Sequence, residues 1–374
     1  MELEKEHKEI VEYVQSLFDK PVFLVGGAVR SILLGQTPKD YDFCSALTTE
    51  EVKEQLKGKY KAYLIGERHG TIGFRCLDED IELTTFRTEI YENGSRKPNV
   101  TFGTDLNEDL QRRDFTINAC ALDATTFKLI DPFDGQKDLQ AGIIRAVGSP
   151  KLRFKEDPLR ILRAIRFATV LDFKIEEATL KKLKSMAFSL MRISRERWVE
   201  EFNKILHSDR VQTGLSMLWE YRIFNFTLPE LAIQWNYDQN SKYHNLQLWE
   251  HTSKVVESAQ QAGEPIEMLW ACLLHDVGKP YTRTDKNTHD SDYCKPGEEF
   301  GIKSNYIMHE RVGAEIALRL CEYLKFSKKM KEEIYGLVKN HLEDDCPLRV
   351  YDNMHKSKLA GELDVLNVKE VVNE

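Results

Sequence analysis

Short apolar runs alternate with turns over the first 145 residues, and this pattern predicts a small β-sheet. Runs rich in β-branched and aromatic residues predict six strands, at Val22–Val25, Tyr41–Ser45, Ala62–Leu64, Thr71–Cys76, Ile81–Arg87 and Ala119–Leu122. Between the first two strands, Ala28–Leu34 predicts a short helix that ends at Gly35. We therefore expect an α+β head built on one small mixed sheet.

After about Arg145 the apolar residues recur at helical spacing and the strand signals fade. This spacing is clear at Leu159, Leu162, Ala164, Ile165 and Ala168. From about His244 a further helical unit begins, in which histidines recur. We expect a head over residues 1–145, a helical neck over 146–210, a helical connector over 211–243 and a helical tail over 244–374.

Cysteine usage and hydropathy bear on location. The seven cysteines are scattered, odd in number and without a CxxC pair, which argues against a disulfide framework or zinc ribbon and predicts reduced thiols in the cytoplasm. No apolar run approaches the ~20 residues of a membrane span, and the polar start MELEKEHKEI is not typical of a signal peptide. We therefore expect no membrane partner.

Positive charge is concentrated in the middle of an acidic chain. The net charge is −8, yet residues 151–210 hold fifteen Lys or Arg against nine Asp or Glu. Such a basic region is typical of a polyanion-binding surface. A solvated helical surface has the same composition, so charge alone leaves both interpretations open.

The first candidate chemistry is in VFLVGGAVR, where a predicted buried strand runs into two glycines. Gly26 and Gly27 allow a sharp turn, and a helix that starts there presents backbone N–H groups to phosphate oxygens. Arg30 follows at a distance from which its guanidinium can reach the same anion. A tight turn without a ligand would use the same glycines.

Two aspartates follow in the second predicted strand. Residues i and i+2 of a strand point to the same face, so Asp40 and Asp42 converge while Tyr41 points away. Adjacent carboxylates repel unless a cation neutralises them, and Mg²⁺ prefers such oxygen ligands together with substrate phosphates. Glu82, in the later strand IELTTF, is a candidate third carboxylate on a neighbouring strand. A solvent-facing acidic turn is the alternative.

These residues resemble the first motif of a known enzyme family. GGAVRS…DYDF is similar to the nucleotidyltransferases related to DNA polymerase β, class II branch, which includes CCA-adding enzymes and bacterial poly(A) polymerases. The similarity continues, in family order, through RRDFTINA (112–119), DPFDG (131–135), EDPLRILRAIRFA (156–168) and RISRERWVEE (192–201). Together these motifs cover roughly residues 20–210.

The resemblance implies roles for particular residues. Asp40 and Asp42 would hold catalytic Mg²⁺, and Gly26, Gly27 and Arg30 would lie against the triphosphate. The second motif would contact phosphate and ribose through Arg113, Asp114 and Asn118. In this family protein side chains select the incoming base without a nucleic-acid template. The matching positions here are Asp157 and Arg160, with Arg163 and Arg166 nearby.

Base selection by this pair is chemically reasonable. At spacing i, i+3, Asp157 and Arg160 would share a helix face, and a carboxylate beside a guanidinium can pair with the edge of cytosine or adenine.

Ser31 stands where the family usually has Asp. The segment 84–104 retains a loop that CC-only relatives typically lack, which favours full CCA or A addition.

The predicted tail carries a second constellation. His251, His275, Asp276, His309 and His341 lie in YHNLQLWEHT, LLHDVGKP, YIMHERVGAE and VKNHLEDD. Histidines on neighbouring helices with an adjacent Asp can bind a divalent metal. The pattern resembles the HD phosphohydrolase superfamily. A final metal-binding Asp is expected downstream, and four positions are possible: Asp344, Asp345, Asp352 and Asp364.

The resemblance therefore implies a CCA-adding nucleotidyltransferase that uses Mg²⁺, CTP and ATP on the tRNA acceptor end. A-only addition and poly(A) synthesis are alternatives within the same chemistry. An HD-type metal-dependent phosphohydrolase is the alternative from another class. The oligomeric state is left open.

Overall fold

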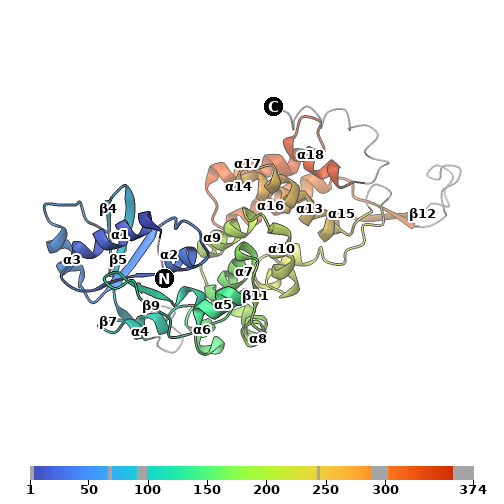
Figure 1. Ribbon diagram of the computed structural model, residues 1–374. Coiled ribbons are helices and arrows are strands. Elements are labelled where there is room, and N and C mark those ends of the chain that lie inside the picture. The colour runs from blue at the N-terminus through green and yellow to red at the C-terminus, as the bar shows by residue number, and fades with distance from the viewer. Residues whose placement is uncertain (1–3, 66–69, 91–98, 242–244, 288–301, 357–374) are drawn as a thin grey trace. The chain divides into compact units, whose positions relative to one another are not determined.

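The computed structural model describes residues 4–65, 70–90, 99–241, 245–287 and 302–356 (Figure 1). Packing divides the chain into two compact units, the first made of residues 1–160 and 173–183 and the second of 161–172 and 184–374. The four domain ranges expected from the sequence stay predictions. Among the described residues, no helix combines the length and apolar character that a membrane crossing requires.

A seven-stranded mixed sheet forms the centre of the first unit. Its strand order is β3-β4-β5-β2-β1-β8-β9, with β2 and β5 parallel and the other neighbours antiparallel. The strands are β1 (Val22–Val25), β2 (Tyr41–Ser45), β3 (Tyr63–Leu64), β4 (Thr71–Cys76), β5 (Glu79–Thr85), β8 (Ala121–Asp123) and β9 (Leu129–Ile130). The predicted strands are thus present, three of them with the predicted bounds.

One face of this sheet is covered by α1 (Lys5–Ser16) and α3 (Thr49–Leu56). Because side chains alternate along a strand, Tyr41 and Phe43 of β2 both point into this core, with 2% and 1% of their surface exposed. The Tyr41 hydroxyl lies 2.8 Å from His7 Nδ1 on α1. The core therefore fixes which residues of β2 face the other way.

The opposite face of the sheet carries the polar side chains. Val25 and Cys44 pack there against Leu110 of α4 (Leu106–Gln111), and Asp42 lies on the same side of β2 as Cys44. A one-residue slip of β2 would bury Asp42 and expose Phe43. Burial of a Phe side chain is worth about 1.5–3 kcal/mol, so this register is strongly favoured.

Smaller elements complete the first unit. They are α2 (Gly27–Leu33), β6 (Arg87–Ile90), β7 (Asn99–Phe102), the 3₁₀ helix η2 (Thr116–Asn118), α5 (Gly135–Ala141), β10 (Ile143–Ile144), α6 (Pro150–Glu156), β11 (Lys174–Ile175) and α8 (Glu177–Met186). β6 pairs antiparallel with β7, and β10 pairs parallel with β11. Of the loop expected at 84–104, residues 91–98 lie outside the described residues.

The second unit is mainly helical, as the spacing predicts. Its elements are α7 (Leu159–Leu171), η3 (Ala187–Arg192), α9 (Arg195–Leu206), α10 (Val211–Glu220), α11 (Phe224–Thr227), α12 (Pro229–Ala232), α13 (Leu248–Gln261), α14 (Ile266–Leu274), α15 (Lys279–Thr282), α16 (His309–Tyr323), α17 (Lys328–Asn340) and α18 (Pro347–Met354). A two-stranded pair, β12 (Thr284–Asn287) and β13 (Ile302–Asn305), was not predicted. The six described cysteines are buried free thiols.

Candidate active site and candidate metal centre

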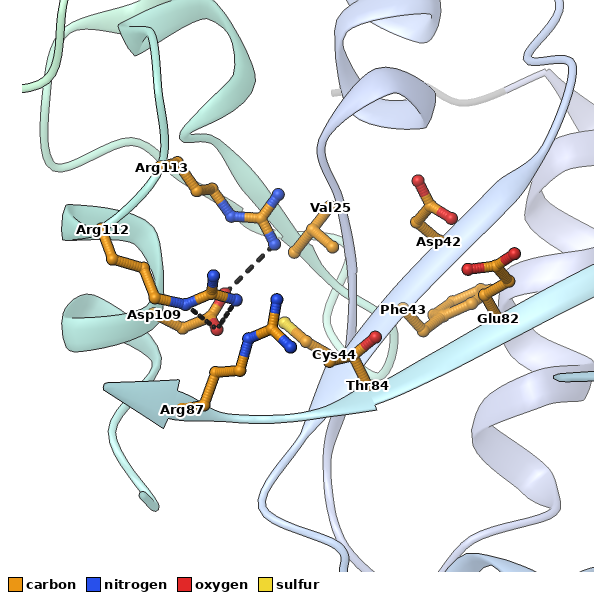
Figure 2. Close-up of a pocket in the computed structure, with 10 residues that line it drawn as sticks. All are labelled: Val25, Asp42, Phe43, Cys44, Glu82, Thr84, Arg87, Asp109, Arg112 and Arg113. Carbon is orange, nitrogen blue, oxygen red and sulfur yellow. Dashed lines mark hydrogen bonds and ion pairs between the residues drawn. The ribbon is translucent and has the colours of Figure 1, made fainter. Parts of the chain in front are cut away.

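Asp42 and Glu82 lie side by side on the polar face of the sheet. They are direct partners in the parallel pairing of β2 with β5, and both line a cavity of about 270 Å³ (Figure 2). The complete lining is Val25, Asp42, Phe43, Cys44, Glu82, Thr84, Arg87, Asp109, Arg112 and Arg113. The sequence prediction that Glu82 stands on a strand beside Asp42 is therefore confirmed.

Asp40 occupies a different environment from Asp42. It is exposed, lies in a bend just before β2 and does not line the cavity. Burial raises the pKa of Asp42, and the charge of Asp40 raises it further, while Arg113 lowers it. Burial, then Asp42, then Asp40 raise the pKa of Glu82. The three carboxylates thus repel one another, and a nearby cation would relieve that repulsion.

The donor chemistry of this acidic side suits a hard cation. Mg²⁺ is usually held by one or two carboxylates and completed by water and substrate phosphates, so a closed protein cage is not required. In the part of the chain that the structure describes, the groups of three or more ligand atoms within 4.8 Å of one another lie in the second unit. The acidic side therefore fits a cation that binds together with a substrate.

The other side of the cavity is basic. Arg87 at the start of β6 and Arg112 and Arg113 just after α4 line it, as Figure 2 shows. Asp109, 1% exposed, accepts hydrogen bonds from both Arg112 and Arg113. The cavity thus sets carboxylates opposite guanidinium groups, an arrangement that suits a metal–polyphosphate ligand.

The glycine turn lies against this basic side. Gly26 has φ 66° and ψ −128°, a conformation that is essentially restricted to glycine. A Cβ atom there would lie 3.1 Å from Arg113 Nη1. The absence of a side chain at Gly26 therefore lets the guanidinium lie close to the turn. Gly27 is the first residue of α2, with an ordinary φ.

The remaining predicted phosphate and ribose residues form one hydrogen-bonded chain. Arg30 donates to Asn118 Oδ1, and Asn118 Nδ2 donates to Asp114 Oδ1 over 3.1 Å. Asp114 Oδ1 also accepts the backbone N–H of Phe115 at 2.8 Å. The structure therefore joins α2 to η2 through the side chains that the sequence singled out.

The predicted shared helix face of Asp157 and Arg160 is wrong. Asp157 has extended backbone angles, φ −135° and ψ 102°, after α6 ends at Glu156. Pro158 explains this, because the residue before a proline is disfavoured in helical conformation. Asp157 Oδ1 instead accepts the N–H of Leu159 at 3.0 Å and so caps α7.

Arg160 lies in the first turn of α7 and is largely buried. Its Nη1 donates to Glu156 Oε2 at 2.8 Å and its Nη2 to the backbone carbonyl of Arg112 at 2.8 Å. The guanidinium orientation is thus fixed by the protein and tied to the backbone beside Arg113. Of the two further arginines on α7, Arg166 forms an ion pair of 2.6 Å with buried Glu201, and the Arg163 guanidinium lies 5.3 Å from the Phe167 ring.

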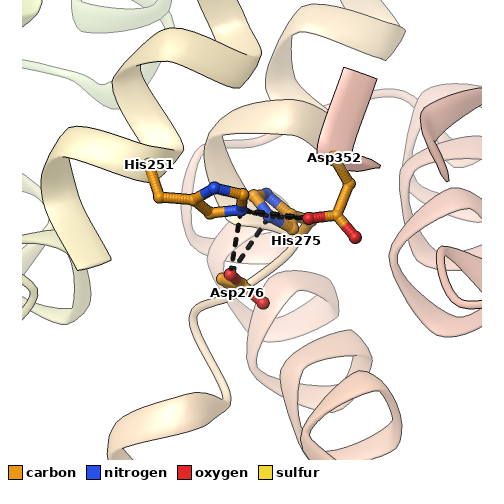
Figure 3. Close-up of side chains that lie close together, drawn as sticks. All are labelled: His251, His275, Asp276 and Asp352. Atoms are coloured by element: carbon orange, nitrogen blue, oxygen red, sulfur yellow. Dashed lines mark hydrogen bonds and ion pairs between the residues drawn. The ribbon is translucent and has the colours of Figure 1, made fainter. Parts of the chain in front are cut away.

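The predicted histidines of the second unit converge, and Asp352 joins them. His251 Nε2 lies 3.2 Å from His275 Nε2 and 3.0 Å from Asp352 Oδ1 (Figure 3). Asp276 Oδ2 lies 3.2 Å from His275 Nε2. Of the four aspartates that the sequence left open, Asp352 of α18 is the one that lies in this cluster, whereas Asp364 lies outside the described residues.

A second group of ligand atoms shares Asp276 with the first. Asp276 Oδ1 lies 3.4 Å from His309 Nε2 and 3.9 Å from His341 Nε2. The Nδ1 atoms of His275, His309 and His341 lie 2.6–2.7 Å from the backbone carbonyls of Cys272, Tyr306 and Val338. Such contacts leave Nε2 as the inward ligand atom. The donor set of imidazoles and carboxylates suits divalent transition metals.

Charges within this cluster are balanced by two lysines. Lys279 Nζ lies 2.6 Å from Asp276 Oδ2, and Lys356 Nζ lies 2.5 Å from Asp352 Oδ2. Burial raises the pKa of Asp276, but His275 and Lys279 lower it more, so the pKa of Asp276 lies well below its usual range. Burial lowers the pKa of His341 to about 3. The cluster therefore presents ionised carboxylates and a neutral His341, which are the states that bind metal.

Three family models match successive parts of the chain. Residues 22–145 match the poly A polymerase head domain, and residues 172–234 match a probable RNA and SrmB-binding site of polymerase A. Residues 248–364 match the HD domain. A CCA-adding enzyme of Streptococcus uberis is 40% identical over 361 residues, which cover 93% of this chain and 84% of the relative. The chain belongs to the CCA-adding enzyme family.

Other CCA-adding enzymes match over shorter stretches. The relative from Enterococcus faecalis is 44% identical over 213 residues, 57% of this chain and 51% of that protein. The chain thus spans about half the length of some curated CCA-adding relatives that it matches.

Solved CCA-adding enzymes have the same fold. The crystal structure of the Bacillus stearothermophilus enzyme in complex with CTP is 27% identical, with a TM-score of 0.66, and covers 91% of this chain and 70% of that one. Another CCA-adding enzyme, solved with CTP, has a TM-score of 0.66 at 21% identity and covers all of this chain and 84% of that one. The latter likeness supports the fold alone.

Sequence reasoning missed part of the cavity lining. Arg87, Asp109 and Arg112 line the cavity but were not predicted. Arg112 could have been predicted, because it is the first residue of the motif RRDFTINA and directly precedes Arg113. Asp109 lies three and four residues before the two arginines, a helical spacing that predicts ion pairs. For Arg87 the sequence offers no comparable signal.

Proposed function

We propose that the chain adds C, C and A to the 3′ end of tRNA from CTP and ATP, without a nucleic-acid template, and releases pyrophosphate. The observation that carries the proposal is the cavity in which Asp42 and Glu82 lie opposite Arg87, Arg112 and Arg113. Membership of the CCA-adding family and the similarity to a structure with CTP support the same reaction.

In this proposal the acidic side holds the reacting groups. Asp40 and Asp42 would bind Mg²⁺, and Glu82 would add a third negative charge. Mg²⁺ held there would activate the attacking hydroxyl and neutralise the leaving pyrophosphate. The 3′ oxygen of tRNA forms a bond to the α-phosphorus, the bond to the β-phosphate oxygen breaks, and a carboxylate of the pair accepts the hydroxyl proton.

The basic side and the glycine turn hold the triphosphate. Arg113 lies against the Gly26 turn, and we assign both, with Gly27 and Arg30, to phosphate binding. Asp114 and Asn118 contact ribose or phosphate. Their hydrogen bonds to one another and to Arg30 restrict these side chains before a ligand arrives, which reduces the cost of binding.

We assign base selection to Asp157, which caps α7, and to Arg160, with Arg163 and Arg166 further along α7. Arg160 is oriented by Glu156 and by the carbonyl of Arg112, so selection and phosphate binding would share a rigid support. The basic region 151–210 would receive the acceptor stem mainly through phosphate contacts, so tRNA affinity falls steeply with salt. A cytoplasmic location stays a prediction from the cysteines.

The test uses three tRNA transcripts that end at the discriminator base, at C and at CC. Each is incubated with Mg²⁺ and labelled CTP, ATP or both, and the products are resolved at single-nucleotide length. Growth of all three to CCA supports the proposal. Growth of the CC-ending transcript alone indicates A-only addition, and unlimited A addition indicates a poly(A) polymerase. No growth with any substrate contradicts nucleotidyl transfer.

A second function is favoured by the buried cluster of the second unit. We propose that its two ligand groups, joined by Asp276, bind divalent metal and hydrolyse phosphate esters, as the match to the HD domain implies. Purified chain would be assayed for bound metal and for cleavage of 2′,3′-cyclic phosphates and phosphomonoesters. His275→Ala should remove both. A metal-free wild-type chain, inactive with added Mn²⁺, Co²⁺ or Ni²⁺, contradicts this function.

A further inference from the structure

One buried carboxylate organises the basic side of the active-site cavity. Asp109 Oδ1 accepts hydrogen bonds from Arg112 Nε at 3.0 Å and from Arg112 Nη2 at 2.7 Å. Its other oxygen, Oδ2, accepts from Arg113 Nη2 at 3.1 Å. Each oxygen therefore holds a different guanidinium, and Figure 2 shows both arginines turned towards Asp109.

This arrangement is built into the end of α4. Asp109 precedes Arg112 and Arg113 by three and four residues, the spacing at which helical side chains meet. Its side chain is 1% exposed, while those of the arginines are 18% and 19% exposed. Burial raises the pKa of Asp109, but the charges of Arg113 and Arg112 lower it more. The carboxylate is therefore ionised, and the contacts are charge-assisted hydrogen bonds.

Arg113 has contacts on its other side as well. Its Nη1 lies 3.5 Å from the carbonyl oxygen of Asn118 and close against the Gly26 turn. The guanidinium thus reaches from Asp109 to the turn, and its charge also acts on Asp42. A guanidinium held at both ends has little rotational freedom to lose when an anion binds.

We propose that Asp109 is a positioning residue for polyphosphate binding. It holds the guanidinium groups of Arg112 and Arg113 in the orientation that receives the phosphate oxygens of a nucleoside triphosphate and, after transfer, of pyrophosphate. Asp109 does not touch the ligand, and its own negative charge opposes an anion. The proposal rests on the proposed nucleotidyl transfer and goes beyond the residues assigned to it.

The opposing charge makes the proposal sharply testable. Asp109→Asn removes one negative charge from the basic side, so a purely electrostatic role predicts tighter anion binding. A positioning role predicts weaker binding, by about tenfold or more, because charge-assisted hydrogen bonds lose their alignment. The dissociation constants of CTP and inorganic tripolyphosphate would be measured by calorimetry with Mg²⁺, beside KM and kcat for CTP.

Two further variants separate the explanations. Asp109→Glu keeps the charge but displaces the carboxylate, and we expect it to weaken tripolyphosphate binding too and to raise KM more than it lowers kcat. Glu108→Gln removes the same charge from the exposed neighbouring position of α4, and we expect no change. If Asp109→Asn does not fold, Asp109→Glu carries the test.

The outcomes distinguish the two proposals. Wild-type affinity in Asp109→Glu, or tighter binding in a folded Asp109→Asn, overturns the role of Asp109 and leaves nucleotidyl transfer intact. A wild-type chain that binds neither CTP nor tripolyphosphate overturns both. Weaker binding in both Asp109 variants, with Glu108→Gln unchanged, supports the positioning role.

Discussion

The negative charge of Asp42 serves metal binding in the proposed reaction, but it lowers the stability of the folded chain. It is partly buried beside Glu82, and burial raises its pKa. We expect Asp42→Asn to lower nucleotide incorporation by about 100-fold or more, because the charge that a metal ligand supplies is worth several kcal/mol. Single-turnover extension of a tRNA ending in CC would measure this. A loss smaller than tenfold would mean that Asp42 is not a metal ligand.

The same substitution should stabilise the chain when no divalent cation is present. A carboxyl with a raised pKa binds its proton more tightly in the folded state, so stability falls as pH rises through the window above the ordinary value of about 4. An Asn side chain does not ionise, so the variant does not lose stability in this way as the pH rises. Thermal melting in EDTA should therefore show Asp42→Asn above the wild type at pH 7.5, with the difference shrinking as the pH is lowered. Equal melting curves at pH 7.5 would contradict the raised pKa.

Individual residues show where sequence reasoning succeeds and where it stops. Asp42 could be predicted because strand alternation and the apolar neighbours Tyr41 and Phe43 define its face. Asp352 could not be chosen over Asp344 or Asp345, since helix packing alone decides which of them meets His251. Asp157 was misplaced because helical spacing was counted across Pro158, although a proline biases its predecessor away from the helix.

At the scale of elements, the turn between β1 and α2 depends on Gly26. We expect Gly26→Ala to destabilise the head by about 1–3 kcal/mol, because its backbone angles are essentially restricted to glycine, and to raise KM for CTP, because the new Cβ displaces Arg113. The matched control is Gly35→Ala, which also has a positive φ but has no atom within 4 Å of the new Cβ. It should lose stability while keeping KM. Equal KM values in both variants would refute the role of the Arg113 contact.

The contact between α15 and α16 depends on a pair of glycines. A Cβ at Gly278 would lie 2.2 Å from the carbonyl oxygen of His309 and 2.6 Å from the N atom of Gly313. Gly278→Ala should therefore shift His309 and weaken metal binding at the cluster, measured as metal content after dialysis. Gly336→Ala on α17 meets nothing within 4 Å and should stabilise its helix by about 1 kcal/mol. Unchanged metal content in Gly278→Ala would argue against His309 as a ligand.

Longer elements with a clear pattern of apolar and polar residues could be predicted, whereas very short ones could not. β1 and β2 have the predicted bounds because each is a mostly buried run; β1 ends at the Gly26 turn, and β2 begins after the bend at Asp40. β10 and β11 have two residues each, too few for alternation to be recognised. Their parallel pairing joins segments about thirty residues apart, with α7 between them, and local pattern carries no information on such partners.

At the scale of the whole molecule, the two proposed sites lie in different units and are assigned different chemistry. We expect His275→Ala to abolish metal binding at the cluster and leave CCA addition within about twofold of wild type. Asp42→Asn should do the reverse. Parallel assays of tRNA extension and phosphate-ester cleavage on both variants would check this. A large loss of extension in a folded His275→Ala variant would mean that the cluster serves the polymerising reaction.

The division of the chain has a consequence for its synthesis. The first unit ends at residue 160, resumes at 173 and closes only at 183, whereas residues 161–172 belong to the second unit. On the ribosome, the first unit therefore cannot be completed until α7 has emerged, because β10 pairs with β11, which follows α7 in the chain. A nascent chain halted near residue 160 should be protease-sensitive at the β10 edge, while one extended well past 183 should be protected. Residues 161–172 of the second unit are thus synthesised before the last segment of the first unit, residues 173–183.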